Sequence, residues 1–273
     1  MINSILLRTR NEEKELAEFT ARIPRNWELI VVDHASSDRT VEVAKRVGAK
    51  VVNYSRKEYS YGAAINSGIS ECAGEWVLVA SLHFEPLIEQ FWEKLSRDLK
   101  DLPLDVLACQ PAGFLTAQAA QPSSGITFFD GNDLDSGFWK IYGNSCCAYR
   151  RSALERFPFD ESLASAEDAE WCVRIVRGGY RIAVDYRLPY LYRNRAPLIR
   201  YWKRGRADGP AVSEAFGVDF RPRWRGLLGS ILKDFGWLLF GRIPWWLWIR
   251  LLVKRLAEFS LLIAPVKEKN AVP

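Results

Sequence analysis

Long apolar runs are missing from this sequence. The amino terminus, MINSILLRTRNEEKEL, lacks the apolar stretch of a secretory signal, so we expect the chain to stay inside the cell. Towards the carboxyl terminus, uninterrupted apolar runs such as 243–249 fall far short of the about 20 residues that a spanning helix needs. The sequence therefore predicts a cytoplasmic protein, whose carboxyl-terminal part can lie on a bilayer more easily than cross it.

The sequence also lacks paired cysteines and a dinucleotide-binding motif, and each absence disfavours one kind of site. The cysteines number five, an odd count without paired spacing, which disfavours a disulfide framework or zinc site and indicates reduced thiols in the core. No G-x-G-x-x-G follows the first apolar segment, so a dinucleotide fold of the NAD type is disfavoured.

The chain has the composition of a folded protein with an uneven charge. With 273 residues, of which 48% are hydrophobic, it can bury a core in one large domain or a domain with an appendage. Residues 1–192 hold 22 Lys and Arg against 27 Asp and Glu, whereas residues 193–255 hold 14 against 4. The basic charge, and most of the tryptophans, therefore belong to the carboxyl-terminal segment.

The first hundred residues alternate between strand and helix patterns. Near-continuous Val, Ile and Leu in the strands indicates burial on both faces, as in a parallel sheet. A further helix, ended at Gly74, leads to a buried strand at 77–80, and the pattern weakens into expected loops from 101 to 137. The predicted strands are 4–9, 28–33 and 49–55, and the predicted helices between them are 12–23 and 39–48.

Polar residues follow two of the predicted strands. The strand at 77–80 stops on Ser81, Leu82 and His83, and the strand at 28–33 ends on Asp33. Parallel α/β sheets bind ligands at the carboxyl ends of their strands. A carboxylate at the position of Asp33 can accept hydrogen bonds from a nucleobase or a ribose hydroxyl, while Ser36 and Asp38 offer side-chain oxygens that can cap the next helix.

Four ordered segments resemble the family 2 glycosyltransferases. They are SILLRTRNEEKEL, ELIVVDHASSDRTVEVAKRVGAKVV, YGAAINSGISECAGEWVLVAS and EDAEWCVRIVRGGYRI, and the likeness covers about residues 3–192. The resemblance implies an inverting enzyme that uses a nucleotide-sugar donor. It also implies the GT-A fold, an α/β fold in which a Rossmann-like nucleotide-binding half carries a mostly parallel mixed sheet.

The same resemblance implies roles for single residues. Asp168 of the Glu-Asp pair is the expected general base, because a carboxylate can take the acceptor's hydroxyl proton. Glu167 is expected either to orient the acceptor or to cap the helix that begins there. Asn66 is the polar candidate in a segment where relatives carry a basic residue. The residues expected around the base and ribose are Thr9, Arg10, Glu12 and Asp33, with Asn66 beside them.

Ser81-Leu82-His83 replaces the Asp-x-Asp of most relatives, in which the last aspartate helps to bind a divalent cation on the donor diphosphate. A subgroup with a Ser-x-His form is associated with bacterial surface polysaccharides. His83 can supply one nitrogen to a weakly held Mn²⁺ or Mg²⁺, so it is a tentative metal ligand. Two alternatives stay open: an imidazolium that faces the diphosphate, and a histidine that only packs at the strand end.

The resemblance defines an expected organisation and activity. Residues 1–194 are expected to form the GT-A catalytic domain, with a nucleotide-binding half (1–100) and an acceptor half (101–194), and residues 195–273 a basic, Trp-rich helical region. The expected activity is that of a hexosyl- or deoxyhexosyltransferase that acts on a glycan or lipid-linked acceptor in surface polysaccharide synthesis. The alternative is a degenerate member that binds a nucleotide-sugar or a partner without turnover. Nucleic-acid binding is disfavoured, because no recognised module surrounds the basic residues.

The carboxyl-terminal region has an interfacial helical pattern. Pro244 suits the first turn of such a helix, and basic residues attract anionic lipid. We therefore expect peripheral attachment to the inner face of the cell membrane; the alternative is a helical hairpin packed on the catalytic domain or in a homodimer. The residues of one face are Arg242, Arg250, Lys254 and Glu258, while Trp246, Ile249, Leu252, Val253 and Leu256 lie largely elsewhere around the helix.

Overall fold

The computed structural model describes two compact units of the chain. The first comprises Met1–Leu163 and Glu167–Asn194, and the second comprises Ala164–Ala166 and Arg195–Pro273. The residues that the structure describes are 3–56, 59–112, 125–136, 143–163, 165–192, 197–199, 201–203, 206, 224–239 and 245–263.

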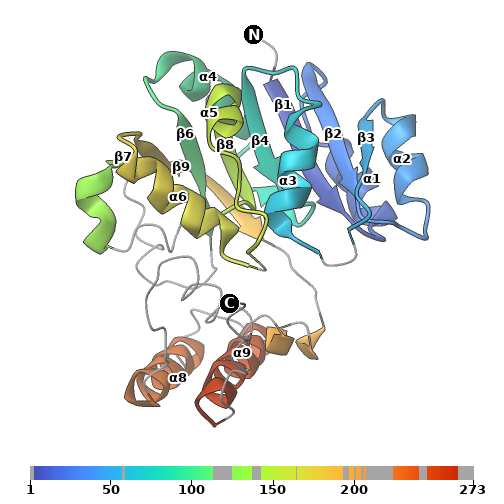
Figure 1. The fold of residues 1–273 in the computed structure, drawn as a ribbon. Helices are drawn as coiled ribbons and strands as arrows, with labels where there is room; N and C mark the ends of the chain where they lie inside the picture. The colour runs from blue at the N-terminus through green and yellow to red at the C-terminus, as the bar shows by residue number, and fades with distance from the viewer. Residues whose placement is uncertain are drawn as a thin grey trace, which may run out of the picture. The chain divides into compact units, whose positions relative to one another are not determined.

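The first unit begins with the predicted alternation of strands and helices (Figure 1). Strands β1 to β4 are mutually parallel, because each apolar strand returns to the sheet through a helix. The carboxyl ends of β1, β2 and β4 therefore meet at one edge. The elements are β1 (Asn3–Thr9), α1 (Glu13–Thr20), β2 (Trp27–Asp33), α2 (Thr40–Arg46), β3 (Lys50–Asn53), α3 (Tyr61–Ile69) and β4 (Trp76–Ala80).

The rest of the unit extends the sheet and makes it mixed. The strand order is β3-β2-β1-β4-β8-β6-β9-β5, and β7 also pairs with β9. Strand β8 runs antiparallel to both β4 and β6, whereas β6 and β9 are parallel. The elements are β5 (Phe84–Pro86), α4 (Phe91–Asp101), β6 (Val106–Ala112), β7 (Ile126–Phe129), the 3-10 helix η1 (Gly131–Ser136), β8 (Cys146–Arg150), α5 (Arg151–Arg156), α6 (Glu167–Arg177) and β9 (Ile182–Tyr192).

The expectation of loops throughout 101–137 is wrong at β6 and β7. Strand β6 is an interior strand, and Val106, Leu107 and Ala108 are almost wholly buried between β8 and β9. Its register with β9 shifts between Cys109 and Gln110. The apolar run of β6 is short and is followed by Gln and Pro. For this reason the sequence lacks the usual pattern of a strand at this position.

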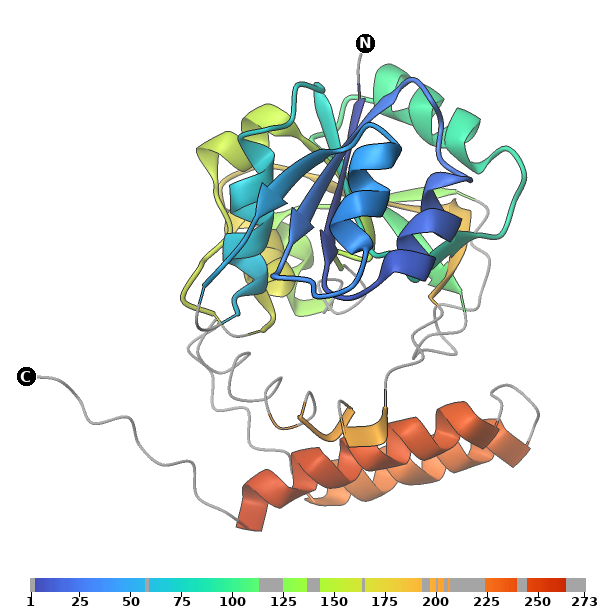
Figure 2. The ribbon, with the colours of Figure 1, turned by 90° about the vertical axis from the view of Figure 1, so that its right-hand side faces the viewer.

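Helices cover both faces of the sheet (Figures 1 and 2). One buried cluster joins Leu6 and Val32 to α3 and α6, and a second joins Leu7 and Val31 to α1 and α4. Burial on both faces explains the near-continuous apolar strands. The five cysteines are free and buried in these cores, which confirms the prediction of core thiols: Cys72, Cys109, Cys146, Cys147 and Cys172.

A glycine follows α2 at the predicted position, whereas the helix end predicted at Gly74 is wrong, because α3 already ends at Ile69 with Ser70 as its C-cap. Gly48 after α2 has φ 79°, and Gly179 after α6 has φ 87°, a left-handed conformation that favours glycine. The apolar face of α6, which includes Trp171 and Ile175, is wholly buried. The position of α6 is thereby fixed, and so is the start of the helix, where Glu167 and Asp168 lie.

The second unit contains a pair of packed helices, α8 (Trp224–Leu239) and α9 (Trp245–Ile263). Phe235 packs against Trp248 with ring centroids 5.8 Å apart, and Arg255 Nε lies 3.5 Å from the buried Asp234 Oδ2. Among the residues that the structure describes, no helix is both long and apolar enough to cross a bilayer. Arg242 and Pro244 of the predicted interfacial pattern lie outside the described residues.

Candidate active site

Thr9 and Asp33 come together at the carboxyl ends of β1 and β2. They are register partners, and Thr9 Oγ1 donates to Asp33 Oδ1 over 3.3 Å. The Asp33 carboxylate also accepts from the Ser36 backbone N–H at 3.0 Å and from Ser36 Oγ at 2.5 Å. Ser36 therefore supports Asp33 instead of capping α2, which corrects the capping alternative for Ser36. Asp33 is thereby held in place as a hydrogen-bond acceptor at the sheet edge.

The loops that follow β1 and β2 are tied to each other. Asn11 Oδ1 accepts from the Ser37 N–H at 2.7 Å, and Asp38 Oδ1 accepts from the Thr40 N–H at 3.0 Å at the start of α2. Asp38 thus binds the first residue of α2 from the position before the N-cap residue, which is Arg39. Ala35 adopts φ 50°, which is unusual for a residue other than glycine or asparagine. Such a conformation is kept only where the surrounding bonds fix the backbone.

The Ser81-Leu82-His83 segment places its histidine beside Glu12. Leu82 is buried in the core, and Ser81 Oγ accepts from the His83 backbone N–H at 3.3 Å. His83 Nε2 lies 3.4 Å from Glu12 Oε1, and its ring centroid lies 6.0 Å from that of Tyr192. The structure thus places Glu12, expected near the base, beside the residue expected near the diphosphate.

Glu12 and His83 are a partial fit to a divalent cation. Within the described part of the chain, no three His, Cys, Asp or Glu side chains gather in a way that could hold a metal ion. Mn²⁺ and Mg²⁺ favour about six ligands, mostly oxygen. One carboxylate and one imidazole can supply two of these, so a bound diphosphate and water would have to supply the others.

A second polar cluster lies at the start of α6. Asn144 Nδ2 donates to Glu167 Oε1 at 3.3 Å, and the Asn144 backbone N–H donates to Asp168 Oδ2 at the same distance. The Tyr149 hydroxyl donates to Asn144 Oδ1, which fixes the orientation of the amide. Asp168 Oδ1 accepts from the Ala169 N–H at 2.8 Å. Asn144 therefore positions both acidic side chains, a role that the sequence did not reveal.

Arg8 lies between the two clusters and was also not predicted. It precedes Thr9 in β1, and its Nη1 is 3.9 Å from Glu167 Oε1. Burial and the neighbouring Asp168 carboxylate raise the pKa of Glu167 to about 7, whereas Arg8 acts in the opposite direction. A basic residue inside the apolar run SILLRT was the signal that could have identified it.

Arg10 and Asn66 contact other parts of the unit. Arg10 Nη1 lies 3.4 Å from His34 Nδ1 at the same sheet edge. The Asn66 amide donates to Phe159 O and to Glu161 Oε1 and accepts from the Phe159 N–H, at 2.9, 3.1 and 3.0 Å. Asn66 thus anchors the segment before α6, and its part in nucleotide binding stays a prediction.

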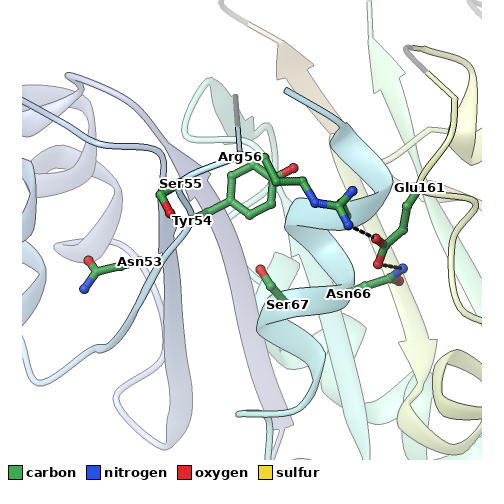
Figure 3. A pocket seen from close by; sticks show the side chains of 8 residues that line it. Asn53, Tyr54, Ser55, Arg56, Asn66, Ser67 and Glu161 are labelled. Atoms are coloured by element: carbon green, nitrogen blue, oxygen red, sulfur yellow. Dashed lines mark hydrogen bonds and ion pairs between the residues drawn. The ribbon is translucent and has the colours of Figure 1, made fainter. Parts of the chain in front are cut away.

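A pocket of about 400 Å³ lies beside the end of β3 (Figure 3). Asn53 is the register partner of Asp33, and the Tyr54 N–H donates to Asp33 O at 2.8 Å, so the pocket adjoins the Asp33 site. Arg56 forms an ion pair with Glu161. The pocket is lined by Asn53, Tyr54, Ser55, Arg56, Ala63, Asn66, Ser67 and Glu161.

The chain is similar to known glycosyltransferase sequences. The family model described as "Glycosyl transferase family 2" matches residues 4–157. The succinoglycan biosynthesis protein ExoA of Rhizobium meliloti (strain 1021) is 27% identical over 206 residues, which is 67% of this chain and 61% of that protein. This chain therefore spans about three fifths of the length of that relative.

Two solved structures share the fold. The mannosyltransferase PcManGT from Pyrobaculum calidifontis, in complex with GDP-Man and Mn²⁺, is 17% identical with a TM-score of 0.62, covering 97% of this chain and 76% of its own. Residues 1–349 of TarS from S. aureus, in complex with UDP-GlcNAc, are 19% identical with a TM-score of 0.59, covering 80% and 68%. At these identities the likeness shows the fold alone.

Proposed function

Because the chain belongs to glycosyl transferase family 2, we propose that it is an inverting enzyme that transfers a sugar from a nucleotide-sugar to a hydroxyl group. Its α/β fold with a mostly parallel sheet is the predicted GT-A fold. The likeness to the succinoglycan protein supports bacterial surface polysaccharide synthesis as the process. We assign catalysis to residues 1–194, hexosyl or deoxyhexosyl as the sugar class, and a glycan or lipid-linked molecule as the acceptor.

The observation that carries this proposal is that two carboxylates, those of Asp33 and Glu167, approach consecutive residues at the end of β1. Thr9 contacts Asp33 on one side, and its neighbour Arg8 approaches Glu167 on the other. We propose that a donor held at Asp33 extends along this edge to the start of α6, where Asp168 accepts a hydrogen bond from the Asn144 N–H. The arrangement supports the assignment of Asp33 to nucleotide binding and of Asp168 to the catalytic base, at the edge where parallel α/β sheets bind ligands.

The proposed reaction needs one proton acceptor. The acceptor's hydroxyl oxygen forms a bond to the anomeric carbon while the bond from that carbon to the diphosphate oxygen breaks. The electron pair leaves with the nucleoside diphosphate, and the hydroxyl proton passes to Asp168. Attack on the face opposite the leaving group inverts the anomeric configuration. Asn144 orients Asp168 through its backbone N–H.

Asp33→Ala should weaken nucleotide binding by about 1.5–3 kcal/mol, the value of a hydrogen bond to a charged group. Isothermal titration calorimetry with nucleoside diphosphates measures the change, and Asp160→Ala is a matched control, because Asp160 accepts from Ser162 within an exposed turn. If Asp33→Ala binds nucleotide as tightly as the parent while it remains folded, Asp33 serves only the turn made with Ser36.

His83→Ala should lower transfer activity both with and without added Mn²⁺ or Mg²⁺. A cation held by His83 and Glu12 would neutralise the diphosphate, and an imidazolium would do the same directly. Titration with Mn²⁺ separates the two: a higher half-maximal concentration in His83→Ala supports the metal ligand, and an unchanged one supports the imidazolium. Activity equal to that of the parent would show that His83 only packs against Tyr192.

The missing Asp-x-Asp favours one second candidate, a degenerate member that binds a nucleotide-sugar without turnover. Asp33 and Asp168 are both present and held by hydrogen bonds, which supports the enzyme. Donor hydrolysis across a panel of nucleotide-sugars, with and without Mn²⁺, decides between them. Hydrolysis of one donor supports transfer, whereas tight binding of a donor that is never cleaved supports the binding protein.

We also propose that the second unit attaches the enzyme to the inner face of the cell membrane, where a lipid-linked acceptor would be presented. A stripe of apolar side chains on α8, between 42% and 68% exposed, supports attachment, as do Trp245 and Trp246 at the start of α9. Tryptophan side chains favour headgroup depth. The α8 stripe consists of Leu228, Leu232, Phe235 and Leu239.

A further inference from the structure

Arg8 is a basic residue at the end of a buried strand. The preceding residues 5–7 are fully buried, and the Arg8 side chain is only 15% exposed. Its Nη1 is covered and has no hydrogen-bond partner among the described residues. A buried guanidinium normally uses its donors, because an unpaired buried polar atom costs stability. The unpaired Nη1 therefore indicates that Arg8 has a role other than stabilising the fold.

The groups that face Arg8 come from α3, the segment before it, and α6. Its guanidinium lies over the Tyr61 ring, 5.0 Å from the centroid, and 3.9 Å from Glu167. Burial lowers the pKa of Arg8, but its electrostatic interactions with the Tyr59 and Tyr61 phenol groups and the Glu167 and Asp168 carboxyl groups outweigh burial and raise it. Burial also raises the pKa of Tyr59 to about 12, so this phenol stays neutral near pH 7. Arg8 is thus the cation that faces the two carboxylates.

We propose that Arg8 is a positioning residue whose positive charge opposes protonation of the buried Glu167 carboxylate, so that less of a proton is held beside Asp168, the proposed base. The catalytic meaning of this inference rests on the proposed function, since it assumes that Asp168 is the base. The effect of Arg8 on Glu167 itself rests on the contacts between these residues. Asn144 holds both carboxylates on one side, and Arg8 is the opposite charge on the other.

The physical reason is the cost of two adjacent negative charges. Without a cation, neighbouring carboxylates share a proton, and their titration belongs to the pair. A proton shared between Glu167 and Asp168 would block the base near neutral pH. At 3.9 Å the Arg8 contact is an ion pair too long for a hydrogen bond, and such contacts often shorten when substrate binds.

Removal of the Arg8 charge should therefore move the titration of the carboxylate pair to higher pH. A positive charge at this range lowers a carboxyl pKa by about 1 to 3, so its loss should raise the midpoint by about 1 to 3 pH units. Transfer by Arg8→Met should fall at pH 7 and recover at higher pH, because hydroxide removes the proton that Arg8 no longer repels. Arg8→Lys should keep part of the effect.

The deciding measurement is the carboxyl ¹³C NMR titration of Glu167 in the full chain, with the signal assigned by its loss in Glu167→Gln. Arg8→Met is compared with the parent and with Arg46→Met, which removes the exposed Arg46–Glu42 pair of α2. Arg8→Gln, which keeps hydrogen-bond donors but no charge, replaces Arg8→Met if the latter does not fold. A midpoint that rises in the Arg8 variants and not in Arg46→Met supports the inference.

An unmoved Glu167 midpoint in a folded, uncharged Arg8 variant overturns the inference, whatever the transfer assay shows. The pH profile of kcat/KM then tests its catalytic meaning: the acid limb should move together with the NMR midpoint. A midpoint that moves in a protein that transfers no sugar from any donor would support the role of Arg8 toward Glu167 and count against the proposed function. The two failures are therefore distinguishable.

Discussion

Asp168→Asn should lower the rate of sugar transfer by about 10² to 10⁴-fold while donor binding persists. Asparagine has nearly the same size and keeps an oxygen that can accept from the Ala169 or the Asn144 N–H. It cannot take up a proton, so only the basic function is removed. Single-turnover transfer with a saturating donor measures the chemical step, and calorimetry measures donor binding in the same preparation.

Glu170→Gln is the matched control for this substitution. Glu170 lies on α6 within one turn of Asp168, and its carboxylate pairs with Arg174 Nε at 2.7 Å, away from Asn144. Its loss should leave transfer near normal, because an ion pair of neighbouring helix residues is worth only about 0.3–0.5 kcal/mol. Near-normal transfer by Asp168→Asn itself would exclude Asp168 as the base.

The part of the fold that follows local rules could be predicted from the sequence. Strands β1, β2 and β4 are apolar on both faces and alternate with helices along the chain, and Gly48 follows α2, so the parallel half was readable. Strand β6 was not readable, since its apolar run is short and its irregular register with β9 breaks the pattern. Its position in the sheet depends on β8 and β9, which lie far along the chain.

The site was predictable where the residues follow strands or begin a helix. Thr9 and Asp33 could be placed together because parallel strands end at one edge, and their contact at 3.3 Å agrees with that. The approach of Glu12 to His83 depends on how the loop after β1 folds back, which no periodicity encodes. Asn144 lies in a short polar stretch without pattern, and only the packing of β8 against α6 brings it to Asp168.

The carboxyl-terminal helices show a similar limit. The predicted pattern concentrated on α9, yet Arg250 of that pattern lies over the Tyr201 and Trp246 rings. Arg255 of the same helix, which was not part of the pattern, pairs with Asp234. The exposed apolar stripe is on α8, where the sequence alone did not place it. Which face of a helical pair is exposed depends on how the two helices pack, and the amphipathic pattern of one helix does not settle that.

The double substitution Leu232→Ser and Leu239→Ser should weaken binding to anionic vesicles by about 10²-fold or more. These leucines are 68% and 67% exposed on α8, so the change removes apolar surface without opening a core. Transfer of two leucine side chains out of water is worth about 3 kcal/mol or more, which corresponds to that factor. Co-sedimentation of the full chain with vesicles of stated anionic lipid content measures the dissociation constant.

The salt dependence of binding and a matched variant distinguish this attachment from non-specific hydrophobic adsorption to vesicles. Binding of the parent should fall as salt rises, because basic residues contribute roughly 1 kcal/mol each near an anionic surface and salt screens them. Val47→Ser and Leu87→Ser, which remove exposed apolar side chains from the first unit, should leave vesicle binding unchanged. Negligible binding by the parent would rule out the membrane role. A dimer of the parent that Leu232→Ser and Leu239→Ser convert to a monomer would then assign the α8 stripe to contact between two copies of the chain.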